Sequence, residues 1–296
     1  MNLRDLRYFV AVAETGHFGR AAQRCHVSQP TLSAQIKKLE DELGTTLIER
    51  RPRAASLTEA GVRTLEHARH VLESVERMSE AARTGGDALA GTLKVGLIPT
   101  VGPYLLPAVS ARLREKLQRL KLLLYEFRTA PLLERVRDGR LDLGILALGI
   151  PLGGLASRPL YREPFALAVP SGHRLARLKR VARSDLNGET LLLLEDGHCL
   201  RDQALEVCRQ SDAHEDQDFR ATSLETLRQM VAAGLGITLL PDLATRGAFA
   251  SSDLNIRPFT APAPDRVVGA VWRTSTTRAV AIDAVCEVLA QARPKG

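Results

Sequence analysis

The chain has 296 residues, enough for two or three compact units, and its 45% hydrophobic and 25% charged residues are typical of a soluble globular protein. No apolar run approaches the roughly 18 residues that a membrane helix needs, and the N-terminus MNLRDLRYF lacks the order of a signal peptide, so we expect a cytoplasmic protein with no membrane partner. The net charge of +7 does not by itself identify a nucleic-acid partner, because residues 1–57 carry 9 Lys and Arg against 6 Asp and Glu.

The four cysteines, Cys25, Cys199, Cys208 and Cys286, are too few and too scattered for a disulfide scaffold, and none has the paired spacing of a zinc site. We therefore expect no metal and no cofactor. In a reducing cytosol the simplest expectation is four buried thiols. We assign this interpretation to Cys25, at the end of a short helix, and to Cys286, on the apolar face of the last helix.

Two helices are predicted at the start of the chain. Apolar side chains recur at helical spacing in LRDLRYFVAVAETG, and a second short helix fits FGRAAQRC. Gly16 lies between them and can end the first helix and redirect the chain.

A third helix is predicted within HVSQPTLSAQIKKLEDELG. Ser28 suits an N-cap, and Pro30 lies in the first turn, where its missing N–H costs little. Its buried face carries Leu32, Ile36, Leu39 and Leu43. The opposite face carries short polar groups near the N-terminus of the helix, which indicates a helix-turn-helix whose second helix enters a DNA major groove.

The run ERRPRAAS follows, and its arginines Arg50, Arg51 and Arg53 surround a proline. It predicts a wing, a short basic loop that contacts phosphates or a minor groove. A solvated basic loop is the alternative, and the neighbouring helix-turn-helix favours the wing. The residues that we expect to contact DNA are Ser28, Gln29, Pro30, Thr31, Ser33, Lys37, Arg50 and Arg53.

A long helix is predicted from Thr58 and Glu59 through about Arg83. Its apolar stripe contains Leu65, Ala68, Leu72, Val75, Met78 and Ala82. A single helix with such a stripe needs a partner, so we expect it to pair with a second subunit. The segment GGDALAG that follows is small and flexible enough for a hinge.

The string AVAETGHFGRAAQRCHVSQPTLSAQIKKLEDELGTTLIER, followed by LTEAG, resembles the DNA-binding region of LysR-type transcriptional regulators. The resemblance implies a winged helix-turn-helix N-terminal domain plus a long linker helix, then an α/β periplasmic-binding-protein-like regulatory domain of two subdomains. The implied boundaries are 1–57 for the DNA-binding domain, 58–90 for the dimerising linker helix and hinge, 91–162 with 268–296 for subdomain I, and 163–267 for subdomain II. His17 departs from the family, which often has serine there as the cap of the second helix.

The rest of the chain alternates strand-like runs with helical ones, which predicts parallel α/β sheets. The strand-like runs are TLKVGLI, KLLLYEF, LDLGILAL, FALAVP, TLLLLE, GITLLP and VVGAVW. Small ligands in such folds bind at the carboxyl ends of strands and at helix N-termini. Thr100 and Thr129 each follow a strand and precede a helix, so we expect their hydroxyls to face a cleft; the alternative is that they only cap the helices.

Two cysteines lie in EDGHCLRDQALEVC, residues 195–208. Gly197 ends a strand and LRDQALEVCRQ predicts a short helix, so Cys199 lies at a helix N-terminus, where the helix dipole favours the thiolate. Cys208 lies on the apolar stripe. Nine helical positions span about 13 Å, whereas a disulfide needs Cα atoms within about 7 Å. The spacing alone leaves two interpretations open: a redox pair that joins only if the helix unwinds, or two core thiols.

The segments IPTVGPYLLP, LEDGHCLRDQA, FRATSLETLR and MVAAGLGITLLP resemble the hydrogen peroxide sensors of the LysR family, and the similarity covers nearly the whole chain. The resemblance implies that Cys199 is the peroxide-reactive thiol and Cys208 the resolving thiol. It also implies that peroxide is bound by Thr100, Thr129, His198 and Arg266, and that Asp142 and Arg273 contact RNA polymerase.

The function implied by this resemblance is a redox-responsive transcription regulator, not an enzyme, that senses hydrogen peroxide through a Cys199–Cys208 disulfide and controls antioxidant genes. The implied partners are double-stranded promoter DNA, further copies of the chain in a homodimer or homotetramer, RNA polymerase, and a cytosolic dithiol reductant. Two alternatives remain. One is a LysR-type regulator that binds a small metabolite between the subdomains and has structural cysteines. The other is a thiol peroxidase, which is disfavoured because an enzyme would not need the DNA-binding head.

Overall fold

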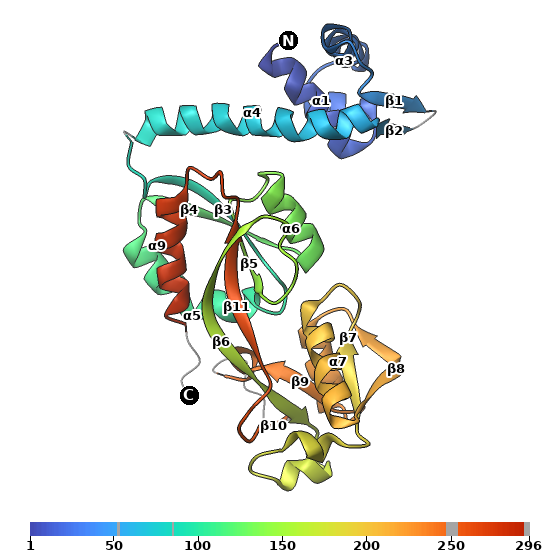
Figure 1. Cartoon of the computed structure of the whole chain (residues 1–296), viewed down its shortest axis with the longest axis vertical. Coiled ribbons are helices and arrows are strands. Elements are labelled where there is room, and N and C mark those ends of the chain that lie inside the picture. The colour runs from blue at the N-terminus through green and yellow to red at the C-terminus, as the bar shows by residue number, and fades with distance from the viewer. Residues whose placement is uncertain (52–53, 85, 247–253, 293–296) are drawn as a thin grey trace. The chain divides into compact units, whose positions relative to one another are not determined.

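The computed structural model describes residues 1–51, 54–84, 86–246 and 254–292 (Figure 1). The chain divides into two compact units, Met1–Asp87 and Ala88–Gly296, and the division falls within the GGDALAG segment. None of the helices in these described ranges combines the length and the apolarity needed to cross a membrane.

The first unit contains three short helices, a hairpin and a long helix. Helices α1 (Leu3–Thr15), α2 (Phe18–Arg24) and α3 (Gln29–Leu43) precede the antiparallel strands β1 (Ile48–Arg51) and β2 (Ala54–Leu57) and helix α4 (Glu59–Thr84). Gly16 ends α1 with a φ of 61°, a left-handed conformation that glycine adopts at little cost. The three short helices share one core, which includes Phe9, Leu32 and Ile36. Because β1 and β2 pair as antiparallel strands, the predicted wing is a two-stranded hairpin and not only a loop.

Polar side chains cap the helices of this unit, among them α2 and α3. Ser28 caps α3 as predicted, because its Oγ accepts a hydrogen bond from the backbone N–H of Thr31 at 3.2 Å. His17 caps α2, because its Nδ1 accepts hydrogen bonds from the N–H of Gly19 at 3.0 Å and of Arg20 at 3.4 Å. A histidine thus satisfies the free N–H groups at the position where LysR-type sequences often have serine.

Helix α4 packs within its own unit over the first half of its apolar stripe. Leu65 and Ala68 are buried in the core of the unit, and Leu72 packs against that core. Met78, further along, is 67% exposed. The pairing of this helix with a second subunit stays a prediction, and Met78 shows that the later part of the stripe is open to a partner.

A seven-stranded sheet forms the framework of the second unit, with the order β10-β6-β11-β5-β3-β4 and with β9 also paired to β6. Its strands are β3 (Gly91–Leu97), β4 (Leu120–Glu126), β5 (Leu143–Ala147), β6 (Ala156–Val169), β9 (Thr238–Pro241), β10 (Asn255–Pro258) and β11 (Asp265–Trp272). Strand β3 is parallel to β4 and β5, whereas β6 forms only antiparallel pairs, with β9, β10 and β11. The prediction of parallel sheets is therefore confirmed for β3, β4 and β5 and wrong for β6 and β11, because the chain passes between the two subdomains along β6 and returns along β11.

Strand β6 belongs to both subdomains. Its first part, through Pro164, pairs with β11, and its last part, from Phe165, lies between β9 and β10. Figure 1 shows β6 and β11 as long neighbouring strands that connect the region of β3, β4 and β5 with the region of β9 and β10. Residues 163–164 and 265–266 therefore lie where one subdomain passes into the other.

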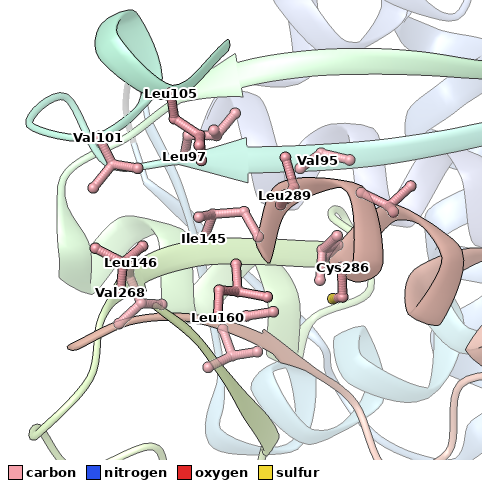
Figure 2. Packing of buried hydrophobic residues seen from close by; sticks show 14 of the residues in the cluster. Val95, Leu97, Val101, Leu105, Ile145, Leu146, Leu160, Val268, Cys286 and Leu289 are labelled. Carbon is pink, nitrogen blue, oxygen red and sulfur yellow. The ribbon is translucent and has the colours of Figure 1, made fainter. Parts of the chain in front are cut away.

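Helices α5 (Gly102–Lys116), α6 (Thr129–Arg137) and α9 (Ala279–Ala290) pack against the sheet of subdomain I. Figure 2 shows side chains from β3, β5, β11 and helices α5 and α9 meeting in one core, among them Leu97, Ile145, Val268 and Leu289. The apolar area removed from water at such positions is the main favourable contribution to folding. This core fixes the ends of β3 and β5 beside which the candidate site lies.

Subdomain II adds the parallel pair β7 (Thr190–Leu194) and β8 (His214–Ala221) and the helices α7 (Cys199–Ser211) and α8 (Leu224–Ala232). Its described residues also include the short 3-10 helices η1 (Arg174–Arg177), η2 (Arg183–Leu186) and η3 (Asp242–Thr245). The sequence pattern does not predict β8 or β10, because HEDQDFRA and NIRP contain no apolar run. Strand β8 forms because its backbone pairs with β7, and β10 forms because its backbone pairs with β6.

The histidine cap of α2 leads to a stability prediction. Replacing His17 by alanine removes the acceptor of two helix N–H groups, so local stability should fall by about 1 kcal/mol. In the full chain, amide hydrogen exchange of α2 should become faster, and His17→Ser should restore slow exchange. Equal exchange in the alanine and serine variants would show that the imidazole does not act as a cap.

Candidate functional site

The predicted DNA-contacting residues of α3 lie at its N-terminus and along its exposed face. Ser28, Gln29, Pro30, Thr31 and Lys37 are exposed, and Ser33 is half-buried. The hydroxyls of Ser28 and Thr31 lie 2.7 Å apart and share a hydrogen bond. Short polar groups on an exposed helix N-terminus are suited to base edges and phosphates, so the exposure of these residues fits the predicted role.

Arg50, on the hairpin, turns back toward α3. Its Nη1 donates to Ser33 Oγ at 2.9 Å, and its guanidinium carbon lies 5.2 Å from the centre of the Phe18 ring. An ion pair to Glu40 at 3.9 Å adds a weaker contact. Arg50 is therefore held against the helix and not extended along the wing. Arg53, also predicted to contact DNA, lies outside the described residues.

Helix α7 carries both candidate redox thiols, and its N-terminus is at Cys199 as predicted. His198 is the N-cap residue, but its side chain makes no capping hydrogen bond. The first N–H groups of the helix therefore have no side-chain cap from His198, and they lie at the end of the helix that carries Cys199. All four cysteines are free thiols, and Cys199 is 7% exposed.

The two thiols of α7 pack into different cores. Cys199 belongs to the core of subdomain I, together with residues of β3, β5 and α5, although it follows a strand of subdomain II. Cys208 belongs to a core of subdomain II with Val207 and Leu167. Burial, followed by the nearby Glu215 carboxylate, raises the pKa of the Cys208 thiol. The helix spans about 13 Å between the two positions, so the intact helix holds these thiols apart.

Arg266 and Thr100 are in direct contact. Arg266 Nη1 donates to Thr100 Oγ1 at 3.0 Å, and Nη2 donates to the Thr100 carbonyl at 2.8 Å. Glu163, which sequence reasoning missed, accepts from Arg266 Nε at 2.8 Å, and both partners of this ion pair are 1% exposed. The only sequence signal for it was an acidic residue within the apolar strand REPFALAV. Thr100 does not cap α5, whose N-cap is Val101.

Thr129 and His198 each present a buried polar atom without a partner. Within the described part of the chain, neither Thr129 Oγ1 nor His198 Nε2 has a hydrogen-bond partner. Thr129 is the first residue of α6 and makes no capping bond, so the alternative that the two threonines only cap helices is wrong. Buried polar atoms are normally hydrogen-bonded, so Thr129 Oγ1 and His198 Nε2, the latter on the residue before Cys199, are available to a small polar ligand.

Ion pairs hold the loop that carries His198 and Cys199. Arg128, at the start of α6, pairs with Glu195 and donates to the carbonyl of Asp196 at 3.4 Å. On the other side, the buried Arg201 pairs with Glu215 and, at 2.9 Å, with Asp196. Arg128, at the start of α6 in subdomain I, thus holds one side of the loop. Arg201, which is itself paired with Glu215 of β8 in subdomain II, holds the other side. Sequence reasoning missed Arg128 and Arg201 as holding residues, because their partners lie on other elements.

A pocket of about 590 Å³ opens along α7. Its lining includes Cys199, Gln203, Val207, Phe165 and Pro264, with three arginines and three carboxylates at its rim and walls. Among the described residues, none of the four predicted peroxide-binding side chains lines this pocket. It is therefore separate from the group formed by Thr100 and Arg266.

The remaining predicted residues have structural contacts. Cys286 is fully buried, which raises its pKa to about 12, and Cys25 is half-buried with a raised pKa. Arg273 is buried and donates to the carbonyls of Val136 and Leu141 at 2.8 and 3.2 Å. The expectation that Arg273 contacts RNA polymerase stays a prediction, and the structure gives this side chain two backbone partners within the chain. Within the described ranges, no group of three or more His, Cys, Asp or Glu residues could hold a metal ion.

Two family models match the chain. The "Bacterial regulatory helix-turn-helix protein, lysR family" model covers residues 3–62, and the "LysR substrate binding domain" model covers residues 86–294. The chain belongs to the LysR family. The expected fold, a helix-turn-helix domain followed by a regulatory domain of two subdomains, is thereby confirmed as a LysR-family fold.

Relatives of known role within the LysR family are closely similar. The chain is 51% identical over 273 residues to the "Hydrogen peroxide-inducible genes activator" of Dickeya chrysanthemi, which covers 92% of this chain and 90% of that protein. It is 50% identical, with the same coverage, to the "DNA-binding transcriptional dual regulator OxyR" of Escherichia coli K12. These relatives are transcription regulators.

Solved structures of two similar proteins match nearly the whole chain. A full-length OxyR from Pseudomonas aeruginosa, with a cysteine changed to aspartate, has a TM-score of 0.78 and 40% identity, and covers 98% of both chains. A cysteine-to-serine mutant of OxyR from Corynebacterium glutamicum, with hydrogen peroxide bound, has a TM-score of 0.68 and 36% identity, and covers 98% of this chain and 92% of that one.

The unpartnered hydroxyl of Thr129 has a measurable consequence for stability. Thr129→Val replaces a buried oxygen that has no partner by a methyl group, so the free energy of unfolding should stay equal or rise by up to about 1 kcal/mol. Thr100→Val should instead lower it by about 1 to 3 kcal/mol, because a donor of Arg266 loses its acceptor. Urea unfolding followed by the single tryptophan, Trp272, measures both. A larger loss in the Thr129 variant would contradict the assigned contacts.

His198 leads to a prediction about pH. Burial, assisted by Arg128, lowers the pKa of His198 below its ordinary value of 6.5. As pH falls below that value, the unfolded chain binds a proton that the folded chain resists, so stability is lost on the acid side. Between pH 7 and 5, His198→Gln should lose less stability than the wild type.

The matched control for this pH experiment is His214→Gln, which changes an exposed histidine of β8. This control should keep the wild-type dependence of the unfolding midpoint on pH. Identical pH profiles for His198→Gln and the wild type would show that the buried imidazole does not contribute.

Proposed function

We propose that this LysR-family protein is a transcription regulator that senses hydrogen peroxide through oxidation of Cys199 and a Cys199–Cys208 disulfide, and so controls antioxidant genes. The observation that carries the proposal is a pair of buried atoms that have no partner among the described residues: Thr129 Oγ1, on the first residue of α6, and His198 Nε2, on the residue before Cys199. The close similarity to hydrogen peroxide-inducible activators supports the same conclusion.

The first step is nucleophilic attack by the Cys199 thiolate on one oxygen of the peroxide. A sulfur–oxygen bond forms, the oxygen–oxygen bond breaks, and the leaving hydroxide takes up a proton to become water. The product is the sulfenic acid of Cys199. Thr100, Thr129, His198 and Arg266 bind and orient the peroxide, while the N-terminal dipole of α7 supports the negative sulfur.

The second step joins the two thiols of α7. The Cys208 thiol attacks the Cys199 sulfenic acid, a sulfur–sulfur bond forms, and water is released. The bond requires Cα atoms within about 7 Å, so α7 has to unwind and at least one sulfur has to leave its core. The disulfide therefore holds a different packing of subdomain II, and a cytosolic dithiol reverses it by exchange.

Each oxidation consumes one peroxide and leaves the protein altered until it is reduced, so the chain acts as a stoichiometric sensor and not as an enzyme. The open half of the α4 stripe supports pairing of subunits into a homodimer or homotetramer. The altered regulatory domains change the spacing of the DNA-reading units on promoter DNA and their contacts with RNA polymerase. The proposed location is the cytoplasm.

The alternative is a LysR-family regulator that responds to a metabolite. The pocket of about 590 Å³ along α7 favours it, because that volume suits an organic ligand far larger than peroxide. In this alternative both thiols stay free in peroxide, and a metabolite raises the melting temperature.

Mass spectrometry of thiols after a brief, low dose of peroxide tests the proposed function. We expect a Cys199–Cys208 crosslink in the wild type and an oxidised Cys199 that persists in Cys208→Ser, because that variant lacks the resolving thiol. Cys199→Ser should leave Cys208 reduced, since burial raises the pKa of Cys208 and keeps it protonated.

Cys286→Ser provides a matched control, because it removes a buried thiol that is outside α7. It should form the crosslink as the wild type does. Free Cys199 and Cys208 in peroxide-treated wild type would reject the proposal and favour the metabolite alternative.

A further inference from the structure

We propose that Glu163 is a positioning residue for the reaction with peroxide: it fixes the guanidinium of Arg266 so that the Thr100 hydroxyl is aimed at the bound peroxide. The inference rests on the proposed function, in which Arg266 and Thr100 bind the peroxide. Glu163 itself touches Arg266 and the backbone of η3 and is not assigned to the peroxide.

The strand register places Glu163 and Arg266 directly opposite each other on β6 and β11. Directly opposed residues of an antiparallel pair have side chains on the same face of the sheet. Both side chains are 1% exposed, and the ion pair is 2.8 Å long. The pair lies where one subdomain passes into the other, so Glu163 holds Arg266 at the junction of the two.

The donors of Arg266 are nearly all used. A guanidinium has five N–H donors. Nε donates to Glu163 Oε2, Nη2 faces the same oxygen and the Thr100 carbonyl, and Nη1 donates to Thr100 Oγ1. Within the described residues this leaves one hydrogen free, on the nitrogen that also holds the Thr100 hydroxyl. Glu163 therefore decides which donors of Arg266 remain for a ligand.

The bond from Arg266 also orients the Thr100 hydroxyl. Because Thr100 Oγ1 accepts from Nη1, its own hydrogen points away from the guanidinium and is available to a ligand oxygen. Glu163 offsets the charge of Arg266, so the arginine acts as a directed donor and not as an uncompensated buried cation. The ion pair fixes the direction in which Arg266 donates its hydrogen bonds, and a displaced guanidinium would no longer donate to Thr100 in that direction.

Glu163 is itself held in place. Its second oxygen, Oε1, accepts a hydrogen bond from the N–H of Leu243 in η3 at 3.0 Å. Both carboxylate oxygens therefore have fixed partners, one in β11 and one in η3. Buried ion pairs contribute little net stability, since desolvation offsets their attraction. A contribution to stability therefore does not account for the buried pair of Glu163 and Arg266, whereas a role in positioning Arg266 accounts for its geometry.

The same two strands provide a matched control. Arg162 and Asp265 precede Glu163 and Arg266 in sequence, and they form a bidentate pair with distances of 2.9 and 2.8 Å. Arg162 is 71% exposed, so this pair faces solvent. Asp265→Asn removes a charge pair from the same strands without changing the buried pair.

The experiment compares the full-length wild type with Glu163→Asp, Glu163→Gln and Asp265→Asn. For each, the rate of Cys199 oxidation by hydrogen peroxide and the rate of its alkylation by iodoacetamide are measured at one pH. Glu163→Asp keeps the charge but shortens the side chain, so it keeps Arg266 neutralised and moves it away from Thr100. Glu163→Gln leaves Arg266 without a counter-charge and is expected to be the less stable protein.

For Glu163→Asp we expect the peroxide rate to fall roughly tenfold, because a small displacement of an orienting group has large effects on rate, while alkylation stays within about twofold of the wild type. Asp265→Asn should leave both rates unchanged. In a Thr100→Val background, Glu163→Asp should cause little further loss, because the two residues act through one chain of contacts.

Three results would overturn the inference: a peroxide rate like that of the wild type in Glu163→Asp, peroxide and alkylation rates that change together, or a full additional loss in the Thr100→Val background. A wild-type Cys199 that does not react with peroxide would instead reject the proposed function. The two failures are therefore distinguishable.

Discussion

The intact helix α7 keeps the thiols of Cys199 and Cys208 apart. Any reaction that joins these two thiols therefore requires a change in the helix. Cys199 is packed into the core of subdomain I and Cys208 into a core of subdomain II. A bond between them cannot form while α7 is intact, since nine helical positions span about 13 Å. A disulfide between these two sulfurs would therefore change the packing of both cores.

Ion pairs from two sides hold the chain just before α7. Arg128, at the start of α6, forms an ion pair with Glu195, and Arg201 forms ion pairs with Asp196 and Glu215. The loop between these contacts carries His198 and leads directly into Cys199. The position of Cys199 is thus fixed by charged groups at the edge of the cores. The Arg128–Glu195 pair is partly exposed and contributes little stability on its own, whereas the Arg201–Glu215 pair is buried and would be costly to break.

Much of the first unit could be predicted from sequence, and less of the candidate site. The apolar spacing of α1 and α3, the Ser28 cap and the start of α7 at Cys199 all depend on residues within one or two helical turns. In contrast, Thr100 and Arg266 meet across 166 positions of sequence, and only a resemblance to known proteins suggested that they belong to one site. The fold of Arg50 back onto Ser33 likewise depends on the approach of the hairpin to α3.

The sequence alone determined the positions of α1 and α3, the second helix of the helix-turn-helix, and that Cys199 lies at a helix N-terminus, because periodicity and capping are local properties. Only the tertiary structure decided the mixed sheet, the separation of the two thiols into different cores, and the position of Glu163 opposite Arg266. The last of these depends on the register of two strands about a hundred residues apart. Strand register is set by the packing of both subdomains, and no local pattern records it.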